Sequence, residues 1–213
     1  MSIALQESLL GFGDEAVPTA VRPERIPLGT DAWIDVQRGW LAGSAGLFTR
    51  LAECVPWRAE RRRMYDRTVD VPRLLCFYGE QAPLPDPALA ACRDALTAHY
   101  AGELGERFAT AGLCFYRDGR DSVAWHGDTI GRGSTQDTMV AIVSLGEARP
   151  LLLRPHDGTS GRSGGETRRY LLGHGDLFVM GGSCQRTWEH AVPKSARATG
   201  PRISVQFRPR DVR

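Results

Sequence analysis

The sequence is almost free of lysine, so nearly all of its positive charge comes from arginine. Lys194 is the one lysine among 27 Lys and Arg residues, which 25 acidic residues balance to a net charge of +2. So small a net charge neither requires nor excludes a nucleic-acid partner. Arginine forks suit carboxylate and phosphate ligands, but a skewed codon usage is the simpler explanation for most of them.

Cysteine is scarce too, and its spacing argues against two kinds of small domain. The five cysteines are odd in number and no two stand at CxxC spacing. This pattern argues against a disulfide framework and against a structural zinc site. We interpret each as a small buried side chain: Cys54, Cys76, Cys92, Cys114 and Cys184.

Long apolar runs are absent from the sequence as well. No run approaches the length of a membrane span, and residues 1–30 lack the apolar core of a signal peptide. We therefore predict a cytoplasmic protein without a membrane partner. The 213 residues fit one domain, which we place at residues 31–213 after a loosely ordered arm. Nothing in the sequence addresses oligomeric state, and a monomer is the default expectation.

In the N-terminal half, the sequence predicts helices and one strand. Residues 31–54 suggest two short helices broken around Gly43–Gly46, and residues 69–79 suggest a strand. The clearest helix begins at Pro87 after Asp86, which is a good N-cap. Its apolar stripe is typical of a helix packed on a sheet and comprises Leu89, Cys92, Leu96, Tyr100 and Leu104.

One segment before that helix is strongly basic. Residues 58–67 carry five arginines. A solvated face and a contact with nucleic-acid phosphates explain this run equally well.

Beyond residue 108 the pattern changes to short β segments separated by turns. Such a succession of short strands indicates a barrel or jelly roll, so we predict a mainly β, α+β fold. The strands are expected at residues 111–117, 122–126, 138–146, 150–155, 168–180 and 201–209.

A candidate metal site lies at the end of one of these segments. His126 and Asp128 stand two residues apart, so in a strand they project to the same side. His190 is the best third ligand, because a downstream strand follows it with the residues that a co-substrate would need. Together they would form the 2-His-1-carboxylate triad of non-haem Fe(II) oxygenases, whose open positions take a 2-oxo acid and dioxygen. The alternative for His126 is a surface histidine beside a turn.

That downstream strand alternates polar and apolar side chains. Two arginines facing into a barrel would be costly unless they met a dianion such as 2-oxoglutarate. The alternative is an edge strand whose arginines lie in solvent. The polar set is Arg202, Ser204, Gln206 and Arg208, and the apolar set is Ile203, Val205 and Phe207.

Taken together, these segments resemble the AlkB-like family of Fe(II)- and 2-oxoglutarate-dependent dioxygenases. VPRLLCFYGE (71–80) is similar to a segment of the family's substrate lid, which we place at about residues 56–85. FYRDGRDSVAWHGD (115–128) resembles the block that carries HxD. Three further matching segments follow in the family's order, at residues 144–155, 174–194 and 201–208.

The resemblance implies a double-stranded β-helix, or jelly roll, with N-terminal helices and the lid packed on it. It implies that Fe(II) is bound by His126, Asp128 and His190. It also implies that the co-substrate 2-oxoglutarate contacts a second set of side chains, with Arg202 on the distal carboxylate and Arg208 near the keto-acid end. That set is Tyr116, Arg202, Ser204 and Arg208.

A substrate contact is implied for two further residues. Tyr78 and the ring of His126 would stack on an extruded base. Arg149 would contact substrate or phosphate, although a structural ion pair explains it equally well.

Several residues depart from the family pattern. Cys114 stands where many members have Asn, and a thiol is a poor substitute for an amide donor. Ser204 and Gln206 replace the usual Asn and Thr of the last segment. Thr129 and Ile130 follow the HxD motif, where the repair enzymes typically have acidic residues that reach toward the base.

Three functions are therefore compatible with the sequence. The first is oxidative dealkylation of N-alkylated bases in DNA or RNA. The second is hydroxylation of a small metabolite or a protein side chain by the same fold, which the missing acidic pair favours. The third is a non-catalytic binding module, against which the intact ligand set argues. Fold and metal site do not fix the substrate, so the lesion and the nucleic acid are left open.

Overall fold

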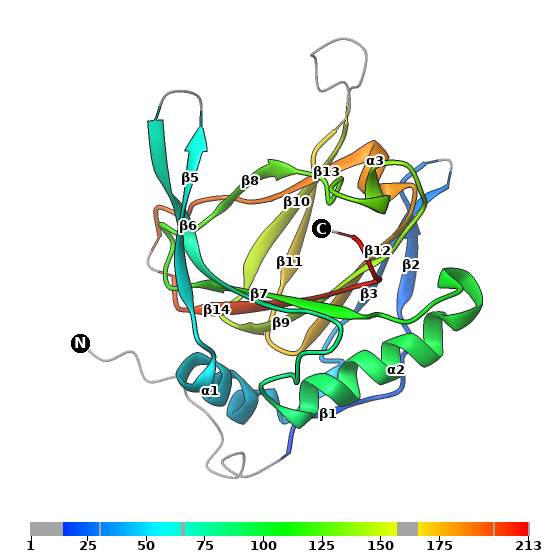
Figure 1. Cartoon of the computed structure of the whole chain (residues 1–213), viewed down its shortest axis with the longest axis horizontal. Helices are drawn as coiled ribbons and strands as arrows, with labels where there is room; N and C mark the ends of the chain where they lie inside the picture. The colour runs from blue at the N-terminus through cyan, green and yellow to red at the C-terminus, as the bar shows by residue number, and fades with distance from the viewer. Residues whose placement is uncertain (1–14, 30, 65–66, 157–165, 198, 213) are drawn as a thin grey trace.

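Two antiparallel sheets face each other, and two helices cover the outer side of the larger one (Figure 1). This computed structural model describes residues 15–29, 31–64, 67–156, 166–197 and 199–212, with backbone only for 62–64 and 67–70. The arrangement is a jelly roll, as predicted. Within the described residues, no helix combines the length and the apolar character that crossing a membrane requires.

The larger sheet has the order β2–β3–β12–β9–β14–β7–β6–β5. In that order its strands span Glu24–Pro27, Ala32–Gln37, Asp176–Gly182, Val140–Gly146, Arg202–Arg208, Thr110–Tyr116, Arg67–Tyr78 and Arg58–Met64. The smaller sheet has the order β11–β10–β13–β8, with strands at Arg168–Leu172, Arg149–Pro155, Trp188–Val192 and Val123–His126.

The remaining elements are short apart from two helices. Strands β1 (Val17–Pro18) and β4 (Leu41–Ala42) pair with each other. The helices are α1 (Ser44–Cys54), α2 (Pro87–Leu104) and α3 (Cys184–Thr187), with a 3-10 turn at Arg132–Ser134.

Helix α2 forms where the sequence predicts it. The Asp86 carboxylate accepts a hydrogen bond of 2.9 Å from the Ala88 N–H, and Pro87 occupies the first turn. Gly105 ends the helix with φ at 70°, a conformation that glycine adopts without strain. The predicted stripe is buried from Leu89 to Tyr100.

The core has two apolar layers. The first lies between the sheets and includes Ile34, Ile142 and Leu153. The second lies between the larger sheet and the helices and includes Leu89 and Phe207. A strand of the larger sheet that runs between these layers is buried on both faces. Any polar side chain on such a strand therefore needs a specific partner.

The N-terminal predictions need two corrections. Residues 32–37 form strand β3, so the first of the two short helices predicted over residues 31–54 is wrong. The prediction of a loosely ordered arm is wrong for residues 24–27, because β2 pairs with β3. Residues 1–14 lie outside the described residues, and the domain boundary stays a prediction.

The arginine-rich segment forms strand β5, which pairs with β6 and extends beyond the rest of the sheet at the upper left of Figure 1. Arg58 and Arg61 are exposed. The side chains of residues 62–67 lie outside the described part, so the proposed phosphate contact stays a prediction. Cys54 is exposed as well, which corrects its assignment as a buried side chain.

Candidate metal centre

The two predicted histidine ligands meet across the smaller sheet. His126 ends β8, and its register partner on β13 is His190. The centres of the two rings lie 4.2 Å apart. The Nδ1 of His126 lies 2.8 Å from the Ala124 carbonyl oxygen. A proton on Nδ1 would make this hydrogen bond and leave Nε2 available for a metal ion.

His190 is held in the form that binds metals. Its side chain is buried, and burial lowers its pKa to about 3, with the nearby His126 acting in the same direction. The imidazole of His190 is therefore neutral at pH 7, and a neutral imidazole nitrogen is a metal ligand.

The third predicted ligand, Asp128, is buried beside Arg208. The Arg208 Nη2 lies 3.1 Å from one carboxylate oxygen and 3.2 Å from the other. Burial alone would raise the pKa of Asp128, but Arg208 and the two histidines outweigh it, so the pKa lies below its ordinary value. The backbone N–H of Asp128 donates to Gln185 at 3.1 Å, which fixes the loop behind it.

As arranged, the three side chains do not close around one point. In the described part of the chain, no three His, Cys, Asp or Glu side chains are grouped closely enough to hold an ion. The Asp128 carboxylate is bound by Arg208 instead. The chemistry of the donors nevertheless fits Fe(II), since two neutral imidazoles and one carboxylate are the set that non-haem iron takes.

A row of polar side chains extends from this centre along β14. This strand lies inside the larger sheet between β7 and β9, so the alternative of an edge strand is wrong. Ile203, Val205 and Phe207 pack in the layer under the helices, and the polar set faces the other way, as alternation predicts.

Arg202 lies buried at the far end of that row. Its Nε donates to the Ser144 hydroxyl at 2.9 Å, and its guanidinium lies 5.4 Å from the centre of the Tyr116 ring. Burial lowers the pKa of Arg202. Its Nη1 is buried and has no hydrogen-bond partner among the described residues. A buried cationic donor without a partner is costly, and an anionic ligand such as the distal carboxylate of 2-oxoglutarate would satisfy it.

The middle of the row carries the residues that depart from the family pattern. Gln206 Nε2 donates to the Ser204 hydroxyl at 2.9 Å and contacts the Cys114 sulfur at 3.5 Å. The long Gln206 side chain has room because Gly112 opposes it: a Cβ there would lie 3.3 Å from Gln206 Oε1 and 3.0 Å from Arg208 Nη1. Gln206 thus places an amide group beside Cys114, the residue that stands where many family members have Asn.

Two further residues beside this row, Ser144 and Arg73, were not predicted from the sequence. Ser144 is fully buried under Arg202. Arg73, in β6, donates to the Ser122 carbonyl at 3.2 Å, and its charge acts on Cys114 and Tyr116. Strand alternation gives a signal for Arg73, because it shares a face with Leu75. Ser144 gives no signal, since its partner is 58 residues away.

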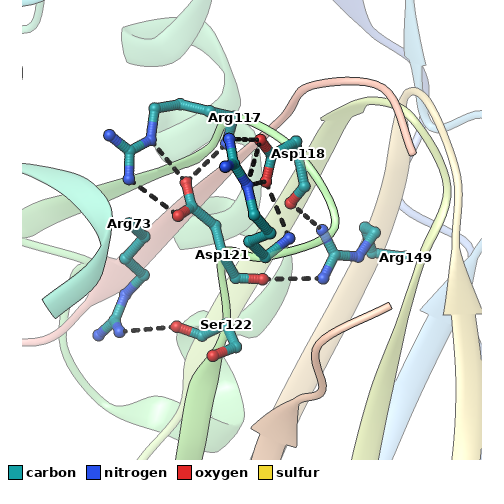
Figure 2. A network of polar contacts seen from close by, with 7 residues as sticks. Arg73, Arg117, Asp118, Asp121, Ser122 and Arg149 are labelled. Carbon is teal, nitrogen blue, oxygen red and sulfur yellow. Dashed lines mark hydrogen bonds and ion pairs between the residues drawn. The ribbon is translucent and has the colours of Figure 1, made fainter. Parts of the chain in front are cut away.

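The predicted substrate contact of Arg149 is wrong. The side chain is buried, and its guanidinium donates to the backbone carbonyls of Asp118, Asp121 and Pro193 at 2.8–2.9 Å. Figure 2 shows Arg149 directed at the turn that carries Asp118 and Asp121. It therefore secures the turn that leads into β8, through carbonyl groups rather than through an ion pair.

The same turn is held from its other side by Arg117 (Figure 2). The Asp121 carboxylate accepts from the Arg117 backbone N–H, Nε and Nη2 at 2.8–2.9 Å. Burial alone would raise the pKa of Asp121, but these bonds outweigh it and hold the pKa below its ordinary value. A turn fixed in this way holds the start of the strand that ends in His126.

Tyr78 does not face the metal centre. It packs with Cys76 against the layer under the helices, and burial raises its pKa. Its neighbour Phe77 projects to the opposite face, where Leu75 packs beside Cys114. The predicted stacking role of Tyr78 is therefore wrong, and Phe77, half exposed, is the aromatic residue on the pocket side.

Comparison with known proteins adds the family context. The model of the 2OG-Fe(II) oxygenase superfamily matches residues 44–208. The alpha-ketoglutarate-dependent dioxygenase alkB homolog 3 of Rattus norvegicus is 30% identical over 173 residues, covering 76% of this chain and 58% of that protein. The DNA oxidative demethylase ALKBH2 of Arabidopsis thaliana is 30% identical over 209 residues, covering 83% and 63%.

The chain thus spans about three-fifths of the length of these curated relatives. The structure of OsALKBH1 superposes with a TM-score of 0.58 at 13% identity, covering 87% of this chain and 99% of that one. At this identity the likeness shows the fold alone.

Proposed function

The chain belongs to the 2OG-Fe(II) oxygenase superfamily, and from this premise we propose that it oxidatively dealkylates N-alkylated bases in nucleic acid. The chemistry of the family requires Fe(II), 2-oxoglutarate and dioxygen, and the resemblance to the AlkB-like members is confirmed by two relatives at 30% identity. The observation that carries the proposal is the polar face of β14, which holds the buried Arg202 with its unpartnered Nη1 at one end and, at the other, Arg208 bound to Asp128.

In this proposal His126, Asp128 and His190 hold Fe(II). Bound iron and co-substrate supply the oxidation of the N-alkyl carbon. For an N-methyl group the overall reaction consumes dioxygen and 2-oxoglutarate and yields the free base, formaldehyde, succinate and carbon dioxide. One oxygen atom enters succinate and the other enters formaldehyde, so atoms balance.

The pocket residues bind and orient. Arg202 takes the distal carboxylate of 2-oxoglutarate on its free Nη1 while Ser144 holds its Nε. The Tyr116 ring closes the same end. Arg208 holds the Asp128 carboxylate and lies near the keto-acid end. Asp128 is ionised at neutral pH, because its pKa is lowered, so it is ready to bind a cation.

A product assay tests this function. Protein reconstituted with Fe(II) without oxygen is exposed to air and 2-oxoglutarate, with single-stranded DNA that carries one N-methylated base or with its unmodified counterpart. We expect formaldehyde and succinate to rise together only with a methylated strand. The His126→Ala and Asp128→Ala variants, folded by circular dichroism, should form neither product.

The second candidate is hydroxylation of a small metabolite or protein side chain, which the absence of acidic residues at Thr129 and Ile130 favours. Succinate formation that no methylated strand stimulates would reject the nucleic-acid substrate and support this candidate. Normal turnover in either ligand variant would reject the proposed triad. The cytoplasmic location and the monomeric state stay predictions.

A further inference from the structure

The short helix α3 packs against the backbone of the loop that carries Asp128. A Cβ added at Gly127 would lie 2.6 Å from the Gln185 carbonyl oxygen and 3.4 Å from the Trp188 carbonyl oxygen. Glycine at position 127 therefore permits the close approach of helix and loop. Burial raises the pKa of the Cys184 thiol to about 12, and the nearby Asp128 carboxylate acts in the same direction. The helix and the side chain of Asp128 thus lie close together.

Gln185 is the side chain of α3 that is bound to this loop. It is 2% exposed, and its Oε1 accepts a hydrogen bond of 3.1 Å from the backbone N–H of Asp128. Its Nε2 is also buried, and it has no hydrogen-bond partner among the described residues. Buried amide donors in folded proteins nearly always have an acceptor. The unpartnered Nε2 therefore indicates an acceptor that this arrangement of the site does not supply.

The Asp128 carboxylate is an acceptor that must change its partners. Arg208 Nη2 now contacts both of its oxygens, at 3.1 and 3.2 Å. Held in this way, the carboxylate does not form a group with His126 and His190 that is close enough to bind an ion. To act as the third ligand it must give up part of its contact with Arg208. A carboxylate that binds a metal is normally hydrogen-bonded by a neighbouring group as well.

We propose that Gln185 is a positioning residue for Asp128, whose carboxylate accepts a hydrogen bond from Gln185 Nε2 when the metal site is occupied. The inference rests on the metal triad of the proposed function, but not on its substrate. The two ends of one amide are adjacent, so the free donor lies beside the residue whose carboxylate must be held. An amide suits this place because it orients the carboxylate without adding charge beside the metal. The thiol of Cys184 is a weaker donor.

The affinity for Mn(II) tests this role without turnover. Gln185→Met keeps the length of the side chain and removes the amide. We expect the metal-free variant, titrated with Mn(II) by calorimetry, to bind the ion about 10- to 100-fold more weakly than the unchanged protein, as is typical when a metal ligand loses its supporting hydrogen bond. An unchanged affinity would overturn the inference.

Thr187 offers a matched control on the same helix. Its hydroxyl donates to the Ser183 carbonyl oxygen at 2.9 Å, at the start of α3. Thr187→Val keeps the shape of the side chain and removes this bond. Both variants should lose stability in urea unfolding, but only Gln185→Met should lose affinity for Mn(II). An equal loss of affinity in Thr187→Val would show that Gln185 acts only by stabilising the helix.

The geometry around the metal gives a second readout. At saturating Co(II), the absorption bands of the ion report its coordination. We expect them to change in Gln185→Met and to stay the same in Thr187→Val. Bands that are identical in all three proteins would contradict a positioning role.

Two measurements do not depend on how well Gln185→Met folds. In a crystal structure of the unchanged protein with Mn(II), Gln185 Nε2 should lie about 2.7–3.2 Å from an Asp128 carboxylate oxygen, and a larger separation would reject the proposed bond. His126→Ala should abolish Mn(II) binding. Normal binding in this variant would reject the triad and the inference with it, whereas lost binding there with unchanged binding in Gln185→Met would reject the role of Gln185 alone.

Discussion

At the residue scale, the direction of one guanidinium decides how the co-substrate is held. Ser144 fixes Arg202 through the 2.9 Å bond to Nε and leaves Nη1 free. We predict that Ser144→Ala weakens 2-oxoglutarate binding about 5- to 20-fold, the cost of about one hydrogen bond to a charged group. Binding of 2-oxoglutarate in the presence of Mn(II), followed by titration calorimetry, checks this without turnover.

Two further variants bracket that result. Arg202→Ala should weaken binding much more than Ser144→Ala, and the apparent KM for 2-oxoglutarate should rise far more in Arg202→Ala than in Arg208→Lys. Ser144→Ala should raise KM with little change in kcat, because it acts on binding through Arg202. A fall in kcat alone would show that Ser144 is not a positioning residue for the co-substrate.

The parts of the candidate site that depend on short-range sequence patterns could be predicted from the sequence. The spacing of His126 and Asp128 and the alternation along β14 are short-range patterns, and the structure orders them as the sequence indicates. The stacking role of Tyr78 follows only from the family resemblance, whereas alternation along β6 puts Leu75 and Phe77 on the inner face and Tyr78 on the other. Arg149 could not be placed from the sequence, since its carbonyl partners lie 28 to 44 residues away.

At the scale of elements, Asp86 joins two helices. It caps α2 at Ala88 N–H, and its other oxygen binds Arg50 of α1 at 2.7 Å. We predict that Asp86→Ala lowers the free energy of unfolding by about 1–2 kcal/mol, mostly through the lost cap. Asp86→Asn keeps a good cap and loses only a partly exposed ion pair, so it should cost less than about 1 kcal/mol.

Urea unfolding of the metal-free protein and the two variants measures this difference. Equal losses in Asp86→Ala and Asp86→Asn would assign the stabilisation to the Arg50 pair rather than to the cap. Binding of 2-oxoglutarate should be the same in all three, because neither helix contributes a residue to the pocket.

Strand β3 shows why one element was mistaken for a helix. Asp35 in this strand is buried. A buried carboxylate is unexpected unless it has charged or hydrogen-bonding partners. Arg25 binds this carboxylate with two bonds of 2.8 Å, and the Tyr100 hydroxyl adds a third at 2.9 Å. These partners lie on β2 and α2, so a local reading of residues 31–37 could not include them.

At the scale of the whole molecule, the jelly roll was predictable from the succession of short β segments separated by turns beyond residue 108. Strands β3, β12, β9 and β7 divide their side chains between the two apolar layers, and the polar side chains of β14 that face the inner layer mark the site. The order of strands was predictable only through the family resemblance, because β12 and β9 pair across more than 30 residues of chain.

We expect the free energy of unfolding to fall in acid, in part because Asp121 becomes protonated. Its folded-state pKa lies below the ordinary value of 3.8, so its ion pair with Arg117 contributes fully above about pH 4. Below that pH the unfolded chain takes up the proton first, and the contribution is lost as the pH falls through the folded-state pKa. One such group changes the free energy of unfolding by at most about 1.4 kcal/mol per pH unit.

We therefore predict that the metal-free protein loses stability between pH 5 and pH 3. At pH 7 the Asp121→Asn variant should be less stable than the unchanged protein by about 1–3 kcal/mol. Between pH 5 and pH 3, however, the variant should lose less stability than the unchanged protein. His190, with its lowered pKa, destabilises both proteins below pH 6.5 and cancels in the comparison. Urea unfolding at pH 7, 5 and 3 measures the two slopes. Parallel slopes would show that the turn before β8 is not held by an ionised Asp121.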